Sequence, residues 1–124
     1  MTKNFKLKEF ECKCGCDMPL EVYENIIKLA GQLQFLRDYT GRPITINSAY
    51  RCPEYNAKIS GSSKKSQHQY GKAADITIQS LKPAEVYALI EELIDMGHLL
   101  QGGLGLYDTF VHYDIRKTKA RWNG

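Results

Sequence analysis

Two segments near the end of the sequence, separated by only two residues, constrain the fold more than any other feature. Residues 103–107 and 110–115 are expected to form strands, with Asp108 and Thr109 as the turn between them. Strands joined by so short a turn pair antiparallel, because a parallel pair needs a crossover of about a dozen residues or more. This hairpin favours an α+β fold over a doubly wound parallel sheet.

The preceding residues alternate between helical and extended patterns. Apolar side chains recur at helical spacing over 19–39 and 82–96, which predicts two amphipathic helices. Segments 44–48 and 73–78 are rich in β-branched residues and predict strands, and 53–59 predicts a short helix. We therefore expect a small antiparallel sheet packed with two main helices.

Length and composition bound the remaining possibilities. The chain has 124 residues with no internal repeat or linker, so a single domain over residues 1–124 is expected. Its 43% hydrophobic and 25% charged residues are typical of a soluble globular protein. No run of about 18 apolar residues occurs, which argues against membrane insertion. The net charge of +3 is too small to predict a nucleic-acid binder, although it allows weak attraction to polyanions.

Four cysteines form a distinctive pattern, with Cys12, Cys14 and Cys16 in one short segment and Cys52 further along. The N-terminal residues lack the apolar segment of a signal peptide, and in such chains clustered cysteines are more often reduced or metal-bound than disulfide-bonded. Zinc fingers usually separate paired ligands by about two to four residues, so the spacing fits them poorly. Three interpretations stay open: reduced thiols, a disulfide from Cys52 to the cluster, or a structural zinc held by all four thiolates.

Two of the three histidines lie in sequence contexts suited to a metal site. His68 precedes the expected strand that carries Asp75, and His112 lies in the last expected strand. Two imidazoles and a carboxylate are a known ligand set for catalytic zinc, which lowers the pKa of its water toward ~7 and polarises a carbonyl. The alternative is that the histidines are hydrogen-bonded and Asp75 caps a turn. His98 follows a helix end, neighbours no acid, and is expected at the surface.

Three motifs carry a resemblance to a known family. Residues 66–75 read Ser-Gln-His-Gln-Tyr-Gly-Lys-Ala-Ala-Asp and resemble the S-x-H-x-x-G-x-A-x-D motif of the zinc D-alanyl-D-alanine carboxypeptidases, a family that includes bacterial wall-trimming enzymes and phage endolysins. Residues 110–116 resemble its F-V-H-x-D-x-R motif. Residues 48–51 resemble its S-x-Y-R segment, followed by Asn56 and Gly61 in N-x-x-x-x-G spacing. The motifs occur in the family's order along nearly the whole chain.

The resemblance implies a Hedgehog/DD-peptidase-like α+β fold and one catalytic Zn²⁺, with His68, Asp75 and His112 as its ligands. It also implies that Arg51 grips the substrate at a terminal carboxylate or at the scissile carbonyl, for which its planar guanidinium is suited. The alternative for Arg51 is a structural ion pair or a stack on a neighbouring tyrosine.

Further substrate contacts are expected from the residues around these motifs. Ser66 and Gln67 are placed to hydrogen-bond the substrate or the surroundings of Asp75, with a loop cap as the alternative for Ser66. Tyr107 is a candidate wall of a peptide groove, as are Tyr70 and Tyr113. Packing in the core or at the rim is the alternative for each tyrosine.

The general base has two candidates. Many relatives place an acidic residue three positions before the last histidine ligand, where this chain has Thr109. Asp114 lies two residues after His112, on the same face of the expected strand, and is the first candidate. Asp108, at the hairpin turn, is the second. A further alternative is that Asp114 orients an imidazole without moving protons.

These inferences predict a zinc-dependent peptidase that hydrolyses peptidoglycan stem peptides at a D-Ala-D-Ala or L-Ala-D-Glu type bond. We expect a monomer that acts on peptidoglycan or muropeptides and binds no nucleic acid. It would be made in the bacterial cytoplasm without a signal peptide and would reach the cell wall through a phage holin, on a phage tail or by other export. The main alternative is a non-catalytic, zinc-stabilised wall-binding module, which the missing acid at Thr109 favours. A zinc finger that contacts nucleic acid rests on the cysteines alone.

Overall fold

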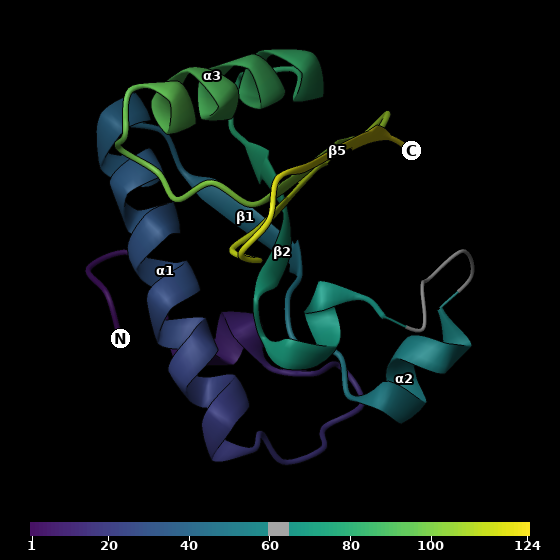
Figure 1. Cartoon of the computed structure of the whole chain (residues 1–124). Coiled ribbons are helices and arrows are strands. Elements are labelled where there is room, and N and C mark those ends of the chain that lie inside the picture. Colours follow the sequence, from purple (N-terminus) through teal and green to yellow (C-terminus); the bar gives the residue numbers. More distant parts are fainter. Residues whose placement is uncertain (60–64) are drawn as a thin grey trace.

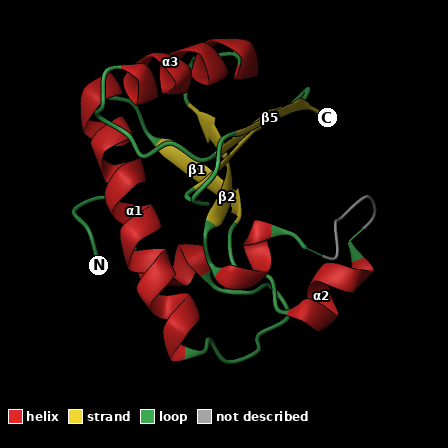
Figure 2. Ribbon diagram, in the orientation of Figure 1, coloured by secondary structure: helices red, strands yellow, loops and turns green. Residues whose placement is uncertain are grey.

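The computed structural model describes residues 1–59 and 65–124. Gly61, expected to follow the short second helix, lies outside the described residues. Helices, strands and connecting loops are distinguished in Figure 2. In chain order the elements are η1 (Leu7–Phe10), α1 (Leu20–Thr40), β1 (Ile44–Ser48), α2 (Pro53–Lys58), η2 (Gln67–Tyr70), β2 (Ala73–Ile78), α3 (Pro83–Asp95), β3 (Gly103–Leu106), β4 (Val111–Asp114) and β5 (Ala120–Asn123).

The expected α+β class is confirmed, and each helix and strand predicted from the sequence is present. The five strands form one sheet in the order β1-β2-β4-β3-β5. The pairs β1–β2, β2–β4 and β3–β4 are antiparallel, as expected. The short 3-10 helices η1 and η2 and the strand β5 are elements that the sequence patterns did not predict.

The sheet is not wholly antiparallel, because β3 and β5 run parallel. Both edges of β4 are already paired, one with β2 and the other with β3. The chain leaving β4 therefore joins the sheet at an outer edge, and it does so beside β3. A short return reverses its direction relative to β4, which makes β5 parallel to β3. The expectation of a purely antiparallel sheet was wrong for this one pair.

The two faces of the sheet have different roles. In Figure 1, α1 on the left and α3 at the top lie on one side of the strands. Along β2, Ala74, Ile76 and Ile78 belong to the hydrophobic core, whereas Asp75 lies between them in sequence and faces the opposite way. In β4, Val111 and Tyr113 join the same core. One face is thus apolar and packed, and the other carries polar side chains.

The N-terminal segment packs beside the end of β1. Phe10 is fully buried and contacts Phe5 edge to face, with ring centroids 6.1 Å apart. The backbone N–H of Tyr50 donates to the carbonyl of Phe10 at 3.1 Å. This contact holds the N-terminal segment against the residues that follow β1. Within the described part of the chain, no helix combines the length and apolar character needed to span a membrane.

Candidate functional site

Three elements bring His68, Asp75 and His112 together on the polar face of the sheet. Asp75 of β2 is the direct antiparallel partner of His112 of β4, and His68 reaches the same point from η2. All three residues are buried, and one ligand atom from each lies within 4.8 Å of the others. Residues that are distant in the sequence therefore form one compact cluster.

The hydrogen bond of His68 to the backbone determines which of its nitrogens faces the cluster. Its Nδ1 lies 2.7 Å from the carbonyl oxygen of Ala49. A carbonyl only accepts, so Nδ1 carries the hydrogen and donates it. The other nitrogen, Nε2, lies 3.2 Å from Oδ1 of Asp75. In the neutral imidazole this Nε2 keeps its lone pair.

In His112 the two ring nitrogens have the opposite roles, with Nδ1 facing the cluster. Its Nε2 donates to Oδ2 of Asp114 at 2.7 Å, and its Nδ1 lies 3.1 Å from Oδ1 of Asp75. The imidazole rings of His68 and His112 meet edge to face, with centroids 5.1 Å apart. Two nitrogen atoms, one from each ring, thus point at the same carboxylate oxygen.

This donor set fits a divalent metal ion. With zinc bonds to nitrogen and oxygen of about 2.0–2.1 Å, the ligand atoms of a tetrahedral site lie about 3.3 Å apart. The separations of 3.2 Å and 3.1 Å from Oδ1 of Asp75 are close to that value. Without an ion, both facing nitrogens donate to Asp75 only if both imidazoles are doubly protonated. A metal lets both rings stay neutral and still satisfies every donor and acceptor.

The charges in the cluster shift the pKa values of its members. Burial raises the pKa of Asp75, but hydrogen bonds from His112 and His68 outweigh it and hold that pKa well below its usual range. Burial lowers the pKa of His112, but its bonds to Asp114 and Asp75 outweigh this and raise the pKa above its ordinary value. The site thus favours a carboxylate anion between two imidazoles.

Asp114 is completely buried and surrounded by donors. Its Oδ1 accepts from the backbone N–H of Gly103 at 2.9 Å and from Nε of Arg116 at 2.9 Å. Its Oδ2 accepts from Nη2 of Arg116 and from His112, each at 2.7 Å. A Cβ on Gly103 would overlap the Asp114 carboxylate, so this close packing requires glycine. Such a carboxylate is built to orient His112, and this geometry favours the positioning alternative over general base catalysis.

Arg51 bridges β1 and the cluster. The register between β1 and β2 shifts between Ile46 and Ser48, and this shift pairs Ser48 with Asp75. Nε of Arg51 donates to the Ser48 hydroxyl at 3.0 Å, and Nη2 donates to Oδ2 of Asp75 at 3.1 Å. The structural ion pair, given above as the alternative for Arg51, is therefore present and uses Nη2 of the guanidinium. Its Nη1 makes no hydrogen bond with the described residues.

The other residues expected to contact the substrate do not share one environment. Ser66 accepts from the backbone N–H of His68 at 3.2 Å, which is the loop cap named as its alternative. Gln67 begins η2 and is half-buried. Tyr113 points to the core side, where its hydroxyl donates to the carbonyl of Leu100 at 2.8 Å. Tyr70 is 49% exposed.

Trp122 of β5 is a site residue that the sequence patterns did not predict. Its ring lies 4.9 Å from that of His112, and the Arg116 guanidinium lies 5.3 Å from its centroid. Its Nε1 donates to the hydroxyl of Tyr107 at 2.9 Å. Tyr107 is thus linked to His112 indirectly, by its hydrogen bond with Trp122. The signal available in the sequence was Gly105, because a glycine inside a strand often marks a close approach by another group. In the structure a Cβ at this position would lie 2.5 Å from the indole ring.

Asp108 lies in the turn between β3 and β4, exposed and with no hydrogen bond or ion pair to another described residue. Thr109 is exposed beside it. His98 is at the surface, as expected, and stacks on Phe35 with centroids 5.3 Å apart.

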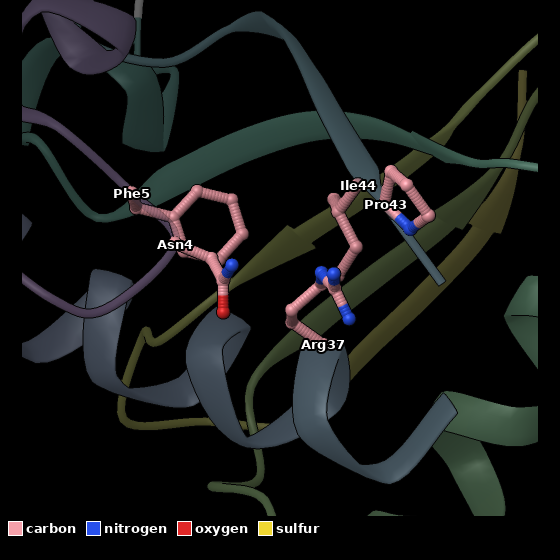
Figure 3. A pocket seen from close by; sticks show the side chains of 5 residues that line it. All are labelled: Asn4, Phe5, Arg37, Pro43 and Ile44. Atoms are coloured by element: carbon pink, nitrogen blue, oxygen red, sulfur yellow. The ribbon is translucent and has the colours of Figure 1, made fainter. Parts of the chain in front are cut away.

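A small pocket lies elsewhere in the molecule. It has a volume of about 150 Å³ and is lined by Asn4, Phe5, Arg37, Pro43 and Ile44 (Figure 3). These residues come from the N-terminal segment, the end of α1 and the start of β1. None of the five was predicted as a site residue, and only Arg37 among them is charged. The pocket shares no residue with the histidine cluster, whose three side chains come from η2, β2 and β4.

Comparison with known proteins agrees with the motifs. The sequence model of the family described as Peptidase M15 matches residues 2–114. The match includes the residues of the histidine cluster, the first two motif segments, and the last motif as far as Asp114. None of the curated proteins compared with the chain matches it.

Proposed function

The chain belongs to the Peptidase M15 family of metallopeptidases, and we propose that it is a zinc-dependent peptidase that cleaves the stem peptides of peptidoglycan. The observation that carries the proposal is the convergence of Nε2 of His68, Nδ1 of His112 and Oδ1 of Asp75 at separations suited to one ion. The resemblance of the three motifs to the wall-trimming carboxypeptidases supports the substrate class.

In this proposal His68, Asp75 and His112 hold one Zn²⁺. When bound there, Zn²⁺ would supply Lewis-acid chemistry suited to a scissile carbonyl and would lower the pKa of water toward neutrality. The carbonyl of Ala49 and the carboxylate of Asp114 fix the two rings and increase the basicity of the ligating nitrogens. Asp114 therefore acts through His112 as a positioning residue.

Arg51 is proposed to bind the substrate. Its bonds to Ser48 and Asp75 fix the plane of the guanidinium, which leaves Nη1 to donate to a substrate oxygen. A terminal carboxylate or a developing oxyanion suits that donor. The first choice corresponds to a carboxypeptidase acting on a D-Ala-D-Ala end. The second also allows an endopeptidase acting on an L-Ala-D-Glu type bond.

Asp108 is the proposed proton acceptor, since Asp114 has both oxygens occupied by donors. Asp108 follows Tyr107, whose hydroxyl is bonded to Trp122 beside His112. Its carboxylate is exposed and has no partner among the described residues that would hold it away from a substrate. The indole of Trp122 and the ring of Tyr107 are proposed to form one wall of the peptide site.

A peptidase of this kind would work at the bacterial cell wall, because that is where its substrate lies. We propose that it acts there as a monomer, after holin release, on a phage tail or by another export route. The net charge of +3 supports a weak attraction to the anionic wall.

The proposal is tested by digesting purified peptidoglycan and identifying the released fragments by mass. We expect stem-peptide fragments, no release in the presence of a strong chelator, and recovery when Zn²⁺ is restored. His68→Ala should lose both zinc and activity, whereas His98→Ala, a matched change at the surface, should keep both. Undiminished digestion by the His68→Ala protein would contradict the proposal.

A second candidate is a non-catalytic wall-binding module that uses the same metal site. Thr109, at the position where many relatives have an acid, favours it, as does the complete engagement of Asp114. This candidate predicts full zinc occupancy and binding to sacculi without any released fragment. Fragment release under the conditions above would rule it out.

A further inference from the structure

A second cluster of metal-ligating side chains lies outside the histidine site. The sulfur atoms of Cys12, Cys14, Cys16 and Cys52 all lie within 4.8 Å of one another. The Sγ atoms of Cys12 and Cys14 are 3.2 Å apart, and those of Cys14 and Cys52 are 3.5 Å apart. All four thiols are free, and these distances are far longer than the roughly 2.05 Å of a disulfide bond. Four zinc-bound thiolates, with Zn–S bonds of about 2.3 Å, have sulfurs about 3.8 Å apart.

The backbone explains how ligands spaced by one residue can converge. Gly15 adopts φ of +83° and its N–H donates to the carbonyl of Cys12 at 3.0 Å. This left-handed turn bends the segment so that Cys14 and Cys16, on either side of Gly15, lie near the same point. A side chain at position 15 would be strained in this conformation. The tight turn at Gly15 thus brings together cysteines whose sequence spacing differs from that of ordinary zinc fingers.

Two backbone donors point at sulfur atoms of the cluster. The N–H of Cys52 donates to Sγ of Cys12, and the N–H of Tyr55 donates to Sγ of Cys52, each at 3.4 Å. Hydrogen bonds to the charged form of a group favour that form, and the thiolate is the form that binds metals. Cys12 is buried whereas Cys14 and Cys16 are exposed, which leaves a path for an ion to enter.

From this geometry we propose that Cys12, Cys14, Cys16 and Cys52 bind one structural Zn²⁺ ion. Soft thiolate ligands in a tetrahedral set select zinc over magnesium or calcium. With four protein ligands the site is closed, so it has no open position for catalysis, unlike the three-ligand histidine site.

The site would fasten the N-terminal segment to the residue directly after Arg51. The bond from Tyr50 to Phe10 ties the same two segments together on the other side of Arg51. Zinc at the thiolates therefore restrains the backbone that presents the Arg51 guanidinium to Asp75. Its contribution is to stability and to the placement of Arg51, and it does not depend on the proposed peptidase function.

The test uses the full chain with His68→Ala, which disables the histidine site, purified under reducing conditions. We expect about one zinc ion per chain, held by a closed four-ligand site, and release of that ion by a thiol-specific mercurial. Replacing it with Co²⁺ should produce an intense thiolate-to-cobalt charge-transfer absorption. The same band should appear in the wild-type chain, which guards against a folding defect in the variant.

Control variants separate ligands from neighbours. Cys14→Ser and Cys16→Ser change exposed residues, so the fold should survive while bound zinc and the cobalt band are lost. Lys13→Ala, between two of the ligands, should keep both. Zinc-free chains with four freely reactive thiols, a cobalt spectrum without thiolate bands, or a disulfide that persists under reducing conditions with metal present would each overturn the proposal. A chain that shows the cobalt band yet digests no peptidoglycan would refute only the peptidase proposal.

Discussion

The imidazole of His112 donates its Nε2 hydrogen to Oδ2 of Asp114 across 2.7 Å, and this bond turns Nδ1 toward Asp75. His68 reaches Asp75 with its other nitrogen, because its Nδ1 donates to a backbone carbonyl. The imidazole of His112 is therefore held by a buried anion, and that of His68 by a neutral carbonyl group. Mutation is therefore expected to affect the hydrogen bonds that orient the two imidazoles differently.

Asp114→Asn should lower zinc affinity by about 10- to 100-fold, the usual effect of losing a partner that orients a metal ligand. The amide has nearly the same shape but removes the charge that holds His112 and Arg116. Zinc affinity is measured by competition with a chelating dye. The kcat is measured separately, at saturating zinc. Full zinc affinity combined with a collapsed kcat would instead mark Asp114 as the general base.

Asp108→Asn should reduce kcat by about 10²- to 10⁴-fold, the range for losing a general base, while zinc content stays unchanged. The reason is that an amide cannot accept the proton that the exposed carboxylate is proposed to take. Thr109→Ala, in the same exposed turn, is the control and should keep its activity. An Asp108→Asn enzyme as fast as the wild type would remove Asp108 from the mechanism.

Arg51→Lys should lower kcat/KM by about 10- to 150-fold, which corresponds to the loss of about 1.5–3 kcal/mol from a charged hydrogen bond. Lysine keeps the positive charge near Asp75 but lacks the planar group that contacts Ser48 and Asp75 and leaves Nη1 free. Arg42→Lys, an exposed change, is the control. Equal kinetics in both variants would show that Arg51 has only its structural ion pair.

Gly105→Ala should destabilise the protein by about 1–3 kcal/mol through overpacking, because its Cβ would lie 2.5 Å from ring atoms of Trp122. Urea unfolding measures the loss, and the fluorescence of this single tryptophan reports its displacement. Gly31→Ala is the opposite case, since a Cβ on this exposed position in α1 meets nothing within 4 Å. It should add about 0.5–1 kcal/mol of stability. Equal effects of the two changes would argue against the tight contact at Gly105.

The ion pair between Glu91 of α3 and Arg121 of β5 should make stability depend on pH. Hydrogen bonds from Arg121 lower the pKa of Glu91 below its ordinary value. A lowered folded-state pKa stabilises the protein above the unfolded pKa, about 4.3, and this stabilisation is lost as pH falls through the folded pKa.

Glu91→Gln should therefore cost about 0.5–1 kcal/mol at neutral pH, as for a partly exposed pair. The difference from the wild type should shrink when the pH is lowered below the pKa of Glu91. Urea unfolding across a pH series measures this, with Glu92→Gln, an exposed neighbour, as the control. A difference that stays constant with pH would mean that the ion pair is not its origin.

The sequence determined most of the local structure. Periodic apolar residues predict α1 and α3, and β-branched runs predict β1 and β2, because each pattern is set by which side chains one element must bury. The two-residue turn made β3 and β4 antiparallel. The motifs also predicted that His68, Asp75 and His112 lie together, and the structure brings them within ligand distance of one another.

The tertiary structure decided what depends on contacts between distant segments. β5 has no strong pattern of its own and forms because β3 offers a free edge, which brings Trp122 beside His112. The strand pattern placed Asp114 on the same face as His112, but only the packing of Gly103 and Arg116 around it shows a carboxylate enclosed by donors. The four cysteines meet only after the N-terminal segment folds against the end of β1. Local periodicity can be read along a chain, whereas these contacts arise from which surfaces remain to be buried once the elements pack.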